Sequence, residues 1–206
     1  MNWTLLSLGM AMSFLTGSIP SAYLYVRIKT GKDIRTMGSG NPGATNVYRT
    51  VGKTAAFVTL IFDIFKGYAC VTFLARAVYQ ETVGIPPGLY VALVGVTVVA
   101  GHNWTVFLHG KGGKGIATSA GVLLGLCPLL LLIGLVTWVV VFAASRVVSI
   151  ASLAAAAIIP AATLLVPTRM SIQLLTLALS VLTLYRHKEN IHRLLRGEEK
   201  ELKVKI

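Results

Sequence analysis

The sequence predicts an all-α integral membrane protein, a polytopic bundle of about seven transmembrane helices that forms a single domain over residues 1–206. Of these 206 residues, 55% are hydrophobic and only 13% are charged, and the mean hydropathy is +0.75. A soluble domain of this length is far less apolar. The apolar residues form six runs. A helix needs about 20 residues to cross the hydrocarbon. The runs cover 3–26, 54–79, 86–108, 116–145, 147–166 and 170–185.

The fourth run, 116–145, is too long for one plain span. Pro128 lies near its middle, and proline removes a backbone donor and clashes with the preceding turn. A break at this proline gives a short helix over 116–126 and a full helix over 128–145, so the predicted number of helices rises to seven. The short helix either crosses the membrane or forms a re-entrant segment.

The distribution of Lys and Arg predicts the orientation of the chain. No cation precedes Arg27, whereas residues 27–53 hold six of them, so the positive-inside rule places the N-terminus outside. Seven crossings then place the basic tail that begins at Arg186 in the cytoplasm, while six crossings would leave it outside. The net charge of +12 is explained by this orientation and by contact with anionic membrane lipids, and no nucleic-acid partner is predicted.

Two glycine-rich loops lie on the predicted cytoplasmic face, Gly-Ser-Gly-Asn-Pro-Gly over 38–43 and Gly-Lys-Gly-Gly-Lys-Gly over 110–115. Glycines let successive backbone N–H groups converge on an anion, and nearby cations neutralise its charge. This pattern favours phosphate binding at the membrane surface, and the plainer alternative is a pair of tight turns between helices. A dinucleotide site is excluded because no strand precedes either loop, and a Walker A motif is excluded because Gly115 follows Lys114.

Few residues of the chain suit metal or disulfide chemistry. Cys70 and Cys127 lie in apolar runs without a CxxC spacing, and Asp occurs only at 33 and 63, so we expect neither a metal site nor a cofactor. Asp63 and Lys66 are three residues apart within the second run, where a charge near the bilayer centre costs about 3 kcal/mol. The pair is therefore either a neutralising bridge between helices or a support for the phosphate site.

Three motifs of the chain resemble those of the membrane acyl-phosphate:glycerol-3-phosphate acyltransferases (PlsY type). The motifs are GSGNPGATN over 38–46 followed by Arg49, GHN over 101–103 leading to KGGKG over 111–115, and HKENI over 187–191 running into RLLRGE over 193–198. Their order and spacing agree over nearly the whole length, and the chain departs from the family pattern at Trp104-Thr105 and His109-Gly110.

The resemblance implies an activity and a location. The enzyme would transfer a fatty acyl group from acyl phosphate to the 1-hydroxyl of glycerol 3-phosphate, giving lysophosphatidic acid and phosphate in bacterial phospholipid synthesis. Its active site would lie at the cytoplasmic face of the inner membrane. Acyl phosphate is a mixed anhydride with a good leaving group, so orientation of two substrates and stabilisation of developing charge suffice without a covalent acyl-enzyme.

The resemblance, together with the chemistry of the residues themselves, predicts the site residues. The expected catalytic residues are Ser39, Arg49, Lys114, His187 and Asn190. The expected substrate- and phosphate-binding residues are Gly38, Gly40, Asn41, Thr45, Asn46, Lys66, His102, Asn103, Lys111, Gly112, Gly113, Gly115 and Ser152. The base that takes the hydroxyl proton is either His187, because histidine titrates near neutral pH, or a phosphate of the substrate itself.

Two functions of other classes fit part of the pattern. A small transporter of a phosphorylated metabolite also needs cationic groups and broken helices, and a lipid-binding scaffold needs a basic membrane face. For the acyltransferase, the expected partners are acyl phosphate, glycerol 3-phosphate and membrane lipids. The sequence leaves the oligomeric state open.

Overall fold

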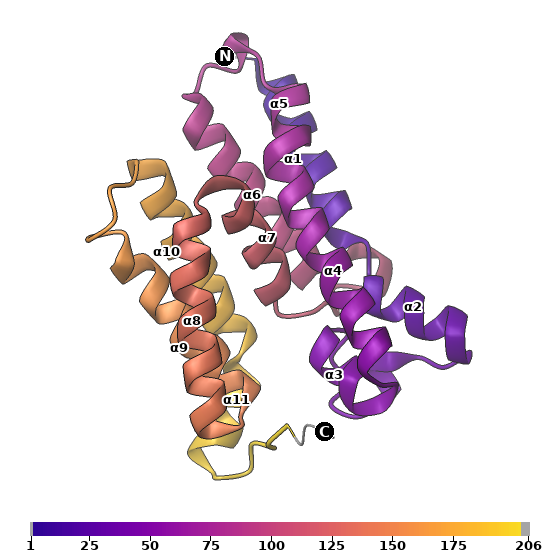
Figure 1. Cartoon of the computed structure of the whole chain (residues 1–206). Helices are drawn as coiled ribbons and strands as arrows, with labels where there is room; N and C mark the ends of the chain where they lie inside the picture. The colour runs from indigo at the N-terminus through magenta and orange to yellow at the C-terminus, as the bar shows by residue number, and fades with distance from the viewer. Residues whose placement is uncertain (1, 203–206) are drawn as a thin grey trace. The chain divides into compact units, whose positions relative to one another are not determined.

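The computed structural model describes residues 2–202, which form helices and connecting loops without a β-strand (Figure 1). The chain divides into two compact units, Met1–Leu126 and Cys127–Ile206. The boundary falls at the predicted break, because Pro128 begins a new helix and Cys127 is the residue that precedes it. The prediction of an all-α protein is confirmed.

Among the described residues, four helical segments are long and apolar enough to cross a membrane: Trp3–Thr30, Lys53–Val78, Pro87–Leu108 and Pro128–Ser145. Three shorter apolar helices cover Ile116–Leu126, Val148–Ala162 and Met170–Arg186. The predicted set of about seven apolar helices, including a short one over 116–126, is therefore confirmed. Which face of the membrane each end occupies stays a prediction from the cation distribution.

The first predicted run is divided, which hydropathy did not indicate. Helix α1 (Trp3–Ser18) ends before Pro20, and α2 (Ser21–Thr30) begins directly after it. Proline cannot donate the backbone hydrogen bond that a continuous helix needs at this point. The Thr105 hydroxyl donates to the Ser18 carbonyl over 2.5 Å and fixes the end of α1.

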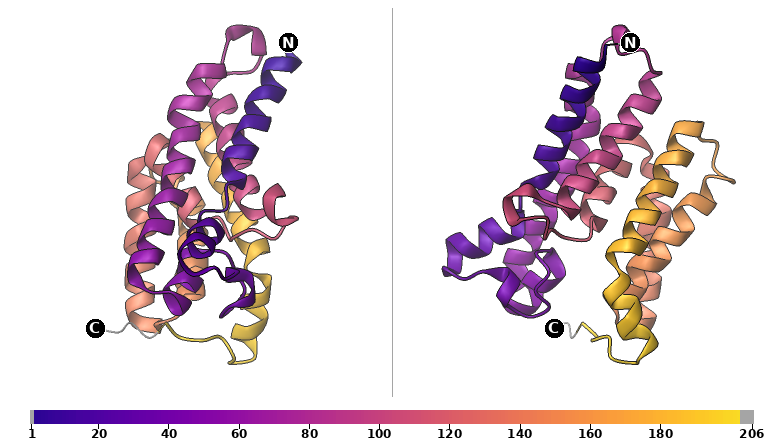
Figure 2. Two further views of the ribbon diagram at one scale, coloured as in Figure 1. Left: turned by 90° about the vertical axis from the view of Figure 1, so that its right-hand side faces the viewer. Right: turned by 180° about the vertical axis from the view of Figure 1, so that it is seen from behind.

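In the first unit, α1 packs against α6 (Pro87–Asn103), and α4 (Lys53–Ala69) packs against α7 (Ile116–Leu126), as Figures 1 and 2 show. A π-helical turn over Cys70–Leu74 joins α4 to α5 (Ala75–Val78). Glycines bring the backbones close: a Cβ on Gly17 would lie 2.0 Å from the Val98 carbonyl oxygen. Such close contacts replace the hydrophobic driving force that is lost in lipid.

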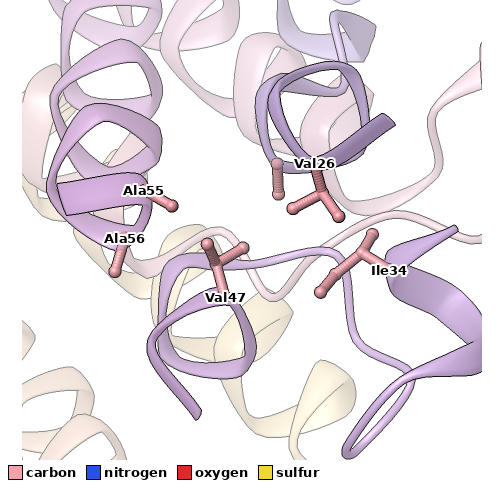
Figure 3. Close-up of a cluster of buried hydrophobic side chains, with 6 residues drawn as sticks. Val26, Ile34, Val47, Ala55 and Ala56 are labelled. Carbon is pink, nitrogen blue, oxygen red and sulfur yellow. The ribbon is translucent and has the colours of Figure 1, made fainter. Parts of the chain in front are cut away.

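The segment between α2 and α4 is held by a small apolar core (Figure 3). Val26 of α2, Ile34 of a 3-10 turn and Val47 of α3 (Ala44–Thr50) are fully buried and pack with Ala55 and Ala56 of α4. Because these side chains come from both sides of the first glycine loop, their packing fixes the ends of that loop.

The second unit contains α8 (Pro128–Ser145), α9 (Val148–Ala162), α10 (Met170–Arg186) and α11 (Lys188–Leu195), and α9 packs against both α8 and α10 (Figure 2). Arg146 adopts a left-handed conformation with φ of 57° in the turn between α8 and α9. Large apolar side chains of α8, including Leu132, Leu135 and Val139, are half exposed, as suits a helix in lipid.

Candidate functional site

The first glycine loop is shaped by one buried amide. The Asn46 Oδ1 atom accepts from the Ser39 backbone N–H over 2.9 Å, and Nδ2 donates to the Met37 carbonyl over 2.9 Å. Gly38 and Gly40 have φ of 56° and 71°, which side chains rarely adopt. A Cβ on Gly38 would also lie 2.3 Å from Asn46 Oδ1. The loop therefore requires glycine, and Asn46 uses its amide to hold it.

Helix α3 follows this loop directly and carries the remaining predicted residues of the first motif. Thr45 lies in its first turn and Arg49 in its last, while Asn41 precedes it in the loop. The side chains of Ser39 and Arg49 are exposed and lie outside the apolar core described above. A hydroxyl and a guanidinium at the edge of a membrane protein suit contact with a phosphorylated substrate.

The second glycine loop folds back onto the end of α6. The backbone N–H of Gly112 donates to the Asn103 carbonyl over 3.2 Å, and that of Gly113 donates to the His102 carbonyl over 3.1 Å. A Cβ on Gly113 would lie only 2.1 Å from His102 Nε2. Asn103 is fully buried, and its Oδ1 atom lies beside Gly115. The loop thus packs tightly against α6 at positions where only glycine fits.

The cations of this loop are placed differently from its glycines. Lys111 is exposed and Lys114 is half buried, whereas Gly112, Gly113 and Gly115 are buried. Helix α7 begins at Ile116, immediately after the loop. A helix N-terminus and adjacent lysines form an environment that favours an anion.

A buried polar cluster lies beneath the second loop. Lys66 Nζ forms an ion pair with Asp63 Oδ1 over 2.8 Å and lies 2.9 Å from His102 Nδ1. The Ser21 hydroxyl donates to the same Asp63 oxygen over 2.8 Å. The pair therefore bridges α4 to α6 and to the start of α2, and His102 connects it to Gly113. Both alternatives drawn from the sequence, a bridge and a support of the loop, agree with this arrangement.

In the second unit, His187 lies at the junction of α10 and α11 and is buried. Its Nδ1 atom is 2.8 Å from the Thr183 backbone carbonyl, which can only accept a hydrogen bond. Nδ1 therefore carries a proton, and Nε2 is the ring nitrogen that can take up or release another. Asn190 follows one turn later and is also buried.

Sequence reasoning missed Glu199, whose carboxylate accepts hydrogen bonds from side chains of α9 and α11 in the second unit. Its Oε1 atom accepts from the Ser149 hydroxyl over 2.7 Å and from Asn190 Nδ2 over 2.5 Å, and its Oε2 atom accepts from Arg193 Nε over 2.6 Å. Burial favours the neutral acid, but the hydrogen bonds from Ser149, Asn190 and Arg193 outweigh it and lower the pKa of Glu199. The signal in the sequence that could have pointed to Glu199 is its acidic side chain within a basic tail.

The predicted residues thus gather in three places. The first loop and α3 hold Gly38, Ser39, Gly40, Asn41, Thr45, Asn46 and Arg49; the second loop and its support hold Lys66, His102, Asn103, Lys111, Gly112, Gly113, Lys114 and Gly115; the second unit holds Ser152, His187 and Asn190. Residues 2–202 contain no group of three or more His, Cys, Asp or Glu side chains that could hold a metal ion.

These features define a multi-pass helical membrane protein with two glycine- and cation-rich loops. Residues 7–197 match the family model described as glycerol-3-phosphate acyltransferase. The glycerol-3-phosphate acyltransferase of Geobacter sulfurreducens is 40% identical over 94% of this chain and 96% of its own length. That of Gloeobacter violaceus is 42% identical over 98% of this chain and 97% of its own.

Solved structures agree with the sequence relatives. The crystal structure of PlsY (YgiH), an integral membrane glycerol 3-phosphate acyltransferase, in its glycerol 3-phosphate form is 32% identical, with a TM-score of 0.86 and 96% of each chain covered. The lysophosphatidic acid form is 30% identical with a TM-score of 0.83, covering 96% of this chain and 95% of the other. The chain belongs to the glycerol-3-phosphate acyltransferase family and is a membrane acyltransferase of the PlsY type.

Proposed function

We propose that this enzyme transfers a fatty acyl group from acyl phosphate to the 1-hydroxyl of glycerol 3-phosphate, giving lysophosphatidic acid and inorganic phosphate. The reaction takes place at the cytoplasmic face of a bacterial inner membrane. The observation that carries the proposal is the second glycine loop, which is fixed to α6 and presents Lys111 and Lys114 before the first turn of α7. Family membership supports the same reaction.

The second loop holds the phosphate of the acyl donor in this proposal. The N–H groups of Gly112 and Gly113 already donate to carbonyls of α6, so these glycines serve the shape of the loop. Binding of the phosphate then falls to the side chains of Lys111 and Lys114 and to the N-terminus of α7. Lys114 stabilises the charge that develops on the leaving phosphate, and such a contact is stronger in the transition state than in the ground state.

The remaining predicted residues serve the acceptor in this proposal. Arg49 offers the phosphate of glycerol 3-phosphate a planar fork of donors, and Ser39 adds a hydroxyl. Asn46 acts by shaping the loop around Gly38 and Ser39. Ser152 and Asn190 are further polar contacts for substrate in the second unit.

The proton of the attacking hydroxyl has two candidate acceptors. His187 Nε2 is one, because the hydrogen bond to Thr183 occupies Nδ1. A phosphate oxygen of the substrate is the other. The His187→Gln variant separates them: a raised KM for glycerol 3-phosphate with a retained pH profile indicates binding, whereas a large loss of kcat and of an ionisation near pH ~6.5 indicates a base.

The deciding experiment uses the purified protein in liposomes with radiolabelled glycerol 3-phosphate. We expect label to enter a chloroform-extractable product only when acyl phosphate is added. Uptake of label without acylation would favour a transporter, and neither uptake nor product would favour a lipid-binding scaffold. Equal rates with acyl-CoA would contradict acyl phosphate as the preferred donor.

A further inference from the structure

The ammonium group of Lys66 is surrounded by three acceptors. Its Nζ atom lies 2.8 Å from Asp63 Oδ1, 2.9 Å from His102 Nδ1 and 3.1 Å from the backbone carbonyl of Ile19. The side chains of Lys66 and Asp63 are 8% and 2% exposed. An ammonium has three donors and no acceptor, so these contacts account for all of its protons.

This arrangement fixes the protonation of His102. Its Nδ1 atom must accept the hydrogen bond from Lys66, because a proton on Nδ1 would place two donors 2.9 Å apart and two cations in contact. Donation from Nδ1 to Asp63 instead is disfavoured, since that distance is 3.4 Å and exceeds a normal N–H···O bond. His102 is therefore neutral, and its proton lies on Nε2.

The protonated nitrogen lies against the phosphate loop. A Cβ on Gly113 would be 2.1 Å from His102 Nε2, so this atom occupies the space that a side chain at position 113 would need and lies against the loop. The Gly113 N–H also donates to the His102 carbonyl, which fixes the loop to the same residue. The ring and the loop cannot shift independently.

We propose that His102 is a neutral hydrogen-bond donor of the phosphate loop, and that the buried Lys66–Asp63 pair acts through it as a positioning device. Asp63 neutralises Lys66, so the pair contributes orientation rather than net charge. The Ser21 hydroxyl holds the carboxylate from the opposite side over 2.8 Å. The proposal rests on the proposed function only for the identity of the anion, the phosphate of the acyl donor.

The tautomer is tested without an activity measurement. The chain has four histidines, so ¹⁵N-histidine labelling of the full chain in nanodiscs gives few imidazole signals, and loss of signals in His102→Gln assigns those of His102. At neutral pH we expect an unprotonated Nδ1 and a protonated Nε2. A protonated Nδ1, in a neutral ring or in an imidazolium, would overturn the proposal. If wild type forms no lysophosphatidic acid, the proposed function fails while this signal is still readable.

The positioning role is tested with a double variant that avoids a buried unpaired charge. Asp63→Asn combined with Lys66→Met removes both charges and frees Nδ1 from its donor. We expect the Nε2–H preference of His102 to weaken. We also expect kcat to fall roughly tenfold or more, which is less than the loss on removing one well-placed donor completely. Lys53→Met, an exposed lysine at the start of the same helix, is the control and should change neither. Unchanged His102 signals in the double variant would contradict the role of the pair.

Two substitutions of His102 separate donation from packing. A glutamine amide reaches about as far as Nε2 and donates, whereas leucine fills space without donating. We expect His102→Leu to lower kcat roughly a hundredfold and His102→Gln to stay within roughly tenfold of wild type, with the KM for glycerol 3-phosphate little changed in both. Equal losses in the two variants would show that the ring only fills space.

Discussion

The indole nitrogen of Trp138 on α8 donates a hydrogen bond to the hydroxyl oxygen of Ser152 on α9 over 3.2 Å. An indole N–H can only donate, so the Ser152 oxygen accepts here and its own proton is directed elsewhere. Phe142 stacks on the Trp138 ring with centroids 4.9 Å apart and limits its rotation. Ser152 is thereby presented as a donor, the form in which a hydroxyl contacts a phosphate or carbonyl oxygen.

Trp138→Phe should therefore weaken the contact that we propose between Ser152 and the substrate. We expect a several-fold rise in KM, because one neutral hydrogen bond contributes about 1 kcal/mol. The KM of the double variant Trp138→Phe, Ser152→Ala should be little higher than that of Ser152→Ala alone, since both changes affect the same interaction. Steady-state kinetics measure this, and Trp3→Phe at an exposed position is the control. Fully additive effects would show that the two residues act separately.

Gly121 of α7 lies against the backbone of α4, and a Cβ there would be 1.9 Å from the Ile64 carbonyl oxygen. Because a helix backbone cannot move aside cheaply, we expect Gly121→Ala to destabilise the protein by about 1–3 kcal/mol. Gly134→Ala on α8 is the matched control, since its Cβ would meet the flexible end of the Ile159 side chain. Thermal unfolding in detergent should show a lower midpoint for Gly121→Ala alone. Equal midpoints would contradict close packing of α4 and α7.

The apolar helices could be predicted because the length of an apolar run directly reflects the thickness of the hydrocarbon. Helix α3 could not, because its segment is polar and its stability depends on packing of Val47 against Val26 and Ile34, which lie apart from it along the chain. The division of the first run at Pro20 had a local signal, but hydropathy alone does not record it.

The same distinction applies to the site. The glycine loops could be recognised because their glycines and lysines are close together in the sequence and shape the same short loop. The spacing of Asp63 and Lys66 predicted their pairing, but His102 joins them from another helix. Glu199 was missed because its partners Ser149 and Asn190 become neighbours only when the second unit has folded.

The predicted orientation can be tested by cysteine labelling. Cysteine at Gly197 should react with a membrane-impermeant maleimide only from the cytoplasmic side, and cysteine at Gln80 only from the outside, because the cations concentrate on one face. Both positions are exposed in the structure. Variants lacking Cys70 and Cys127 provide the background. Labelling of the Gly197→Cys variant from outside would require an even number of crossings.

Among the cations of the chain, substitution of Lys114 should lower turnover the most. We expect Lys114→Ala to lower kcat roughly a hundredfold, because one well-placed donor to developing charge contributes about 3 kcal/mol. Lys32→Ala removes an exposed cation from the same predicted face and should have almost no effect, which separates transition-state chemistry from general attraction to anionic lipid. Near-normal turnover of Lys114→Ala at equal expression would refute the phosphate-loop mechanism.

Glu199 predicts a pH-dependent stability of the second unit. Its pKa is lowered from an ordinary value of 4.5, since the hydrogen bonds from Ser149, Asn190 and Arg193 outweigh burial. The stabilisation is therefore fully present above pH 4.5 and is lost as the pH falls through the folded-state pKa. At pH 7, Glu199→Gln should lower the unfolding midpoint by roughly 4 °C, given about 2 kcal/mol for charge-assisted hydrogen bonds.

The comparison across pH distinguishes the carboxylate charge from the shape of the side chain. Protonated glutamate and glutamine are close in size and hydrogen-bonding capacity, so the difference between wild type and Glu199→Gln should shrink as the pH falls below about 4.5. Glu198→Gln, at the exposed neighbouring position, should follow wild type at every pH. A constant difference between wild type and Glu199→Gln across the same range would mean that the ionised carboxylate does not hold Ser149 and Asn190 together.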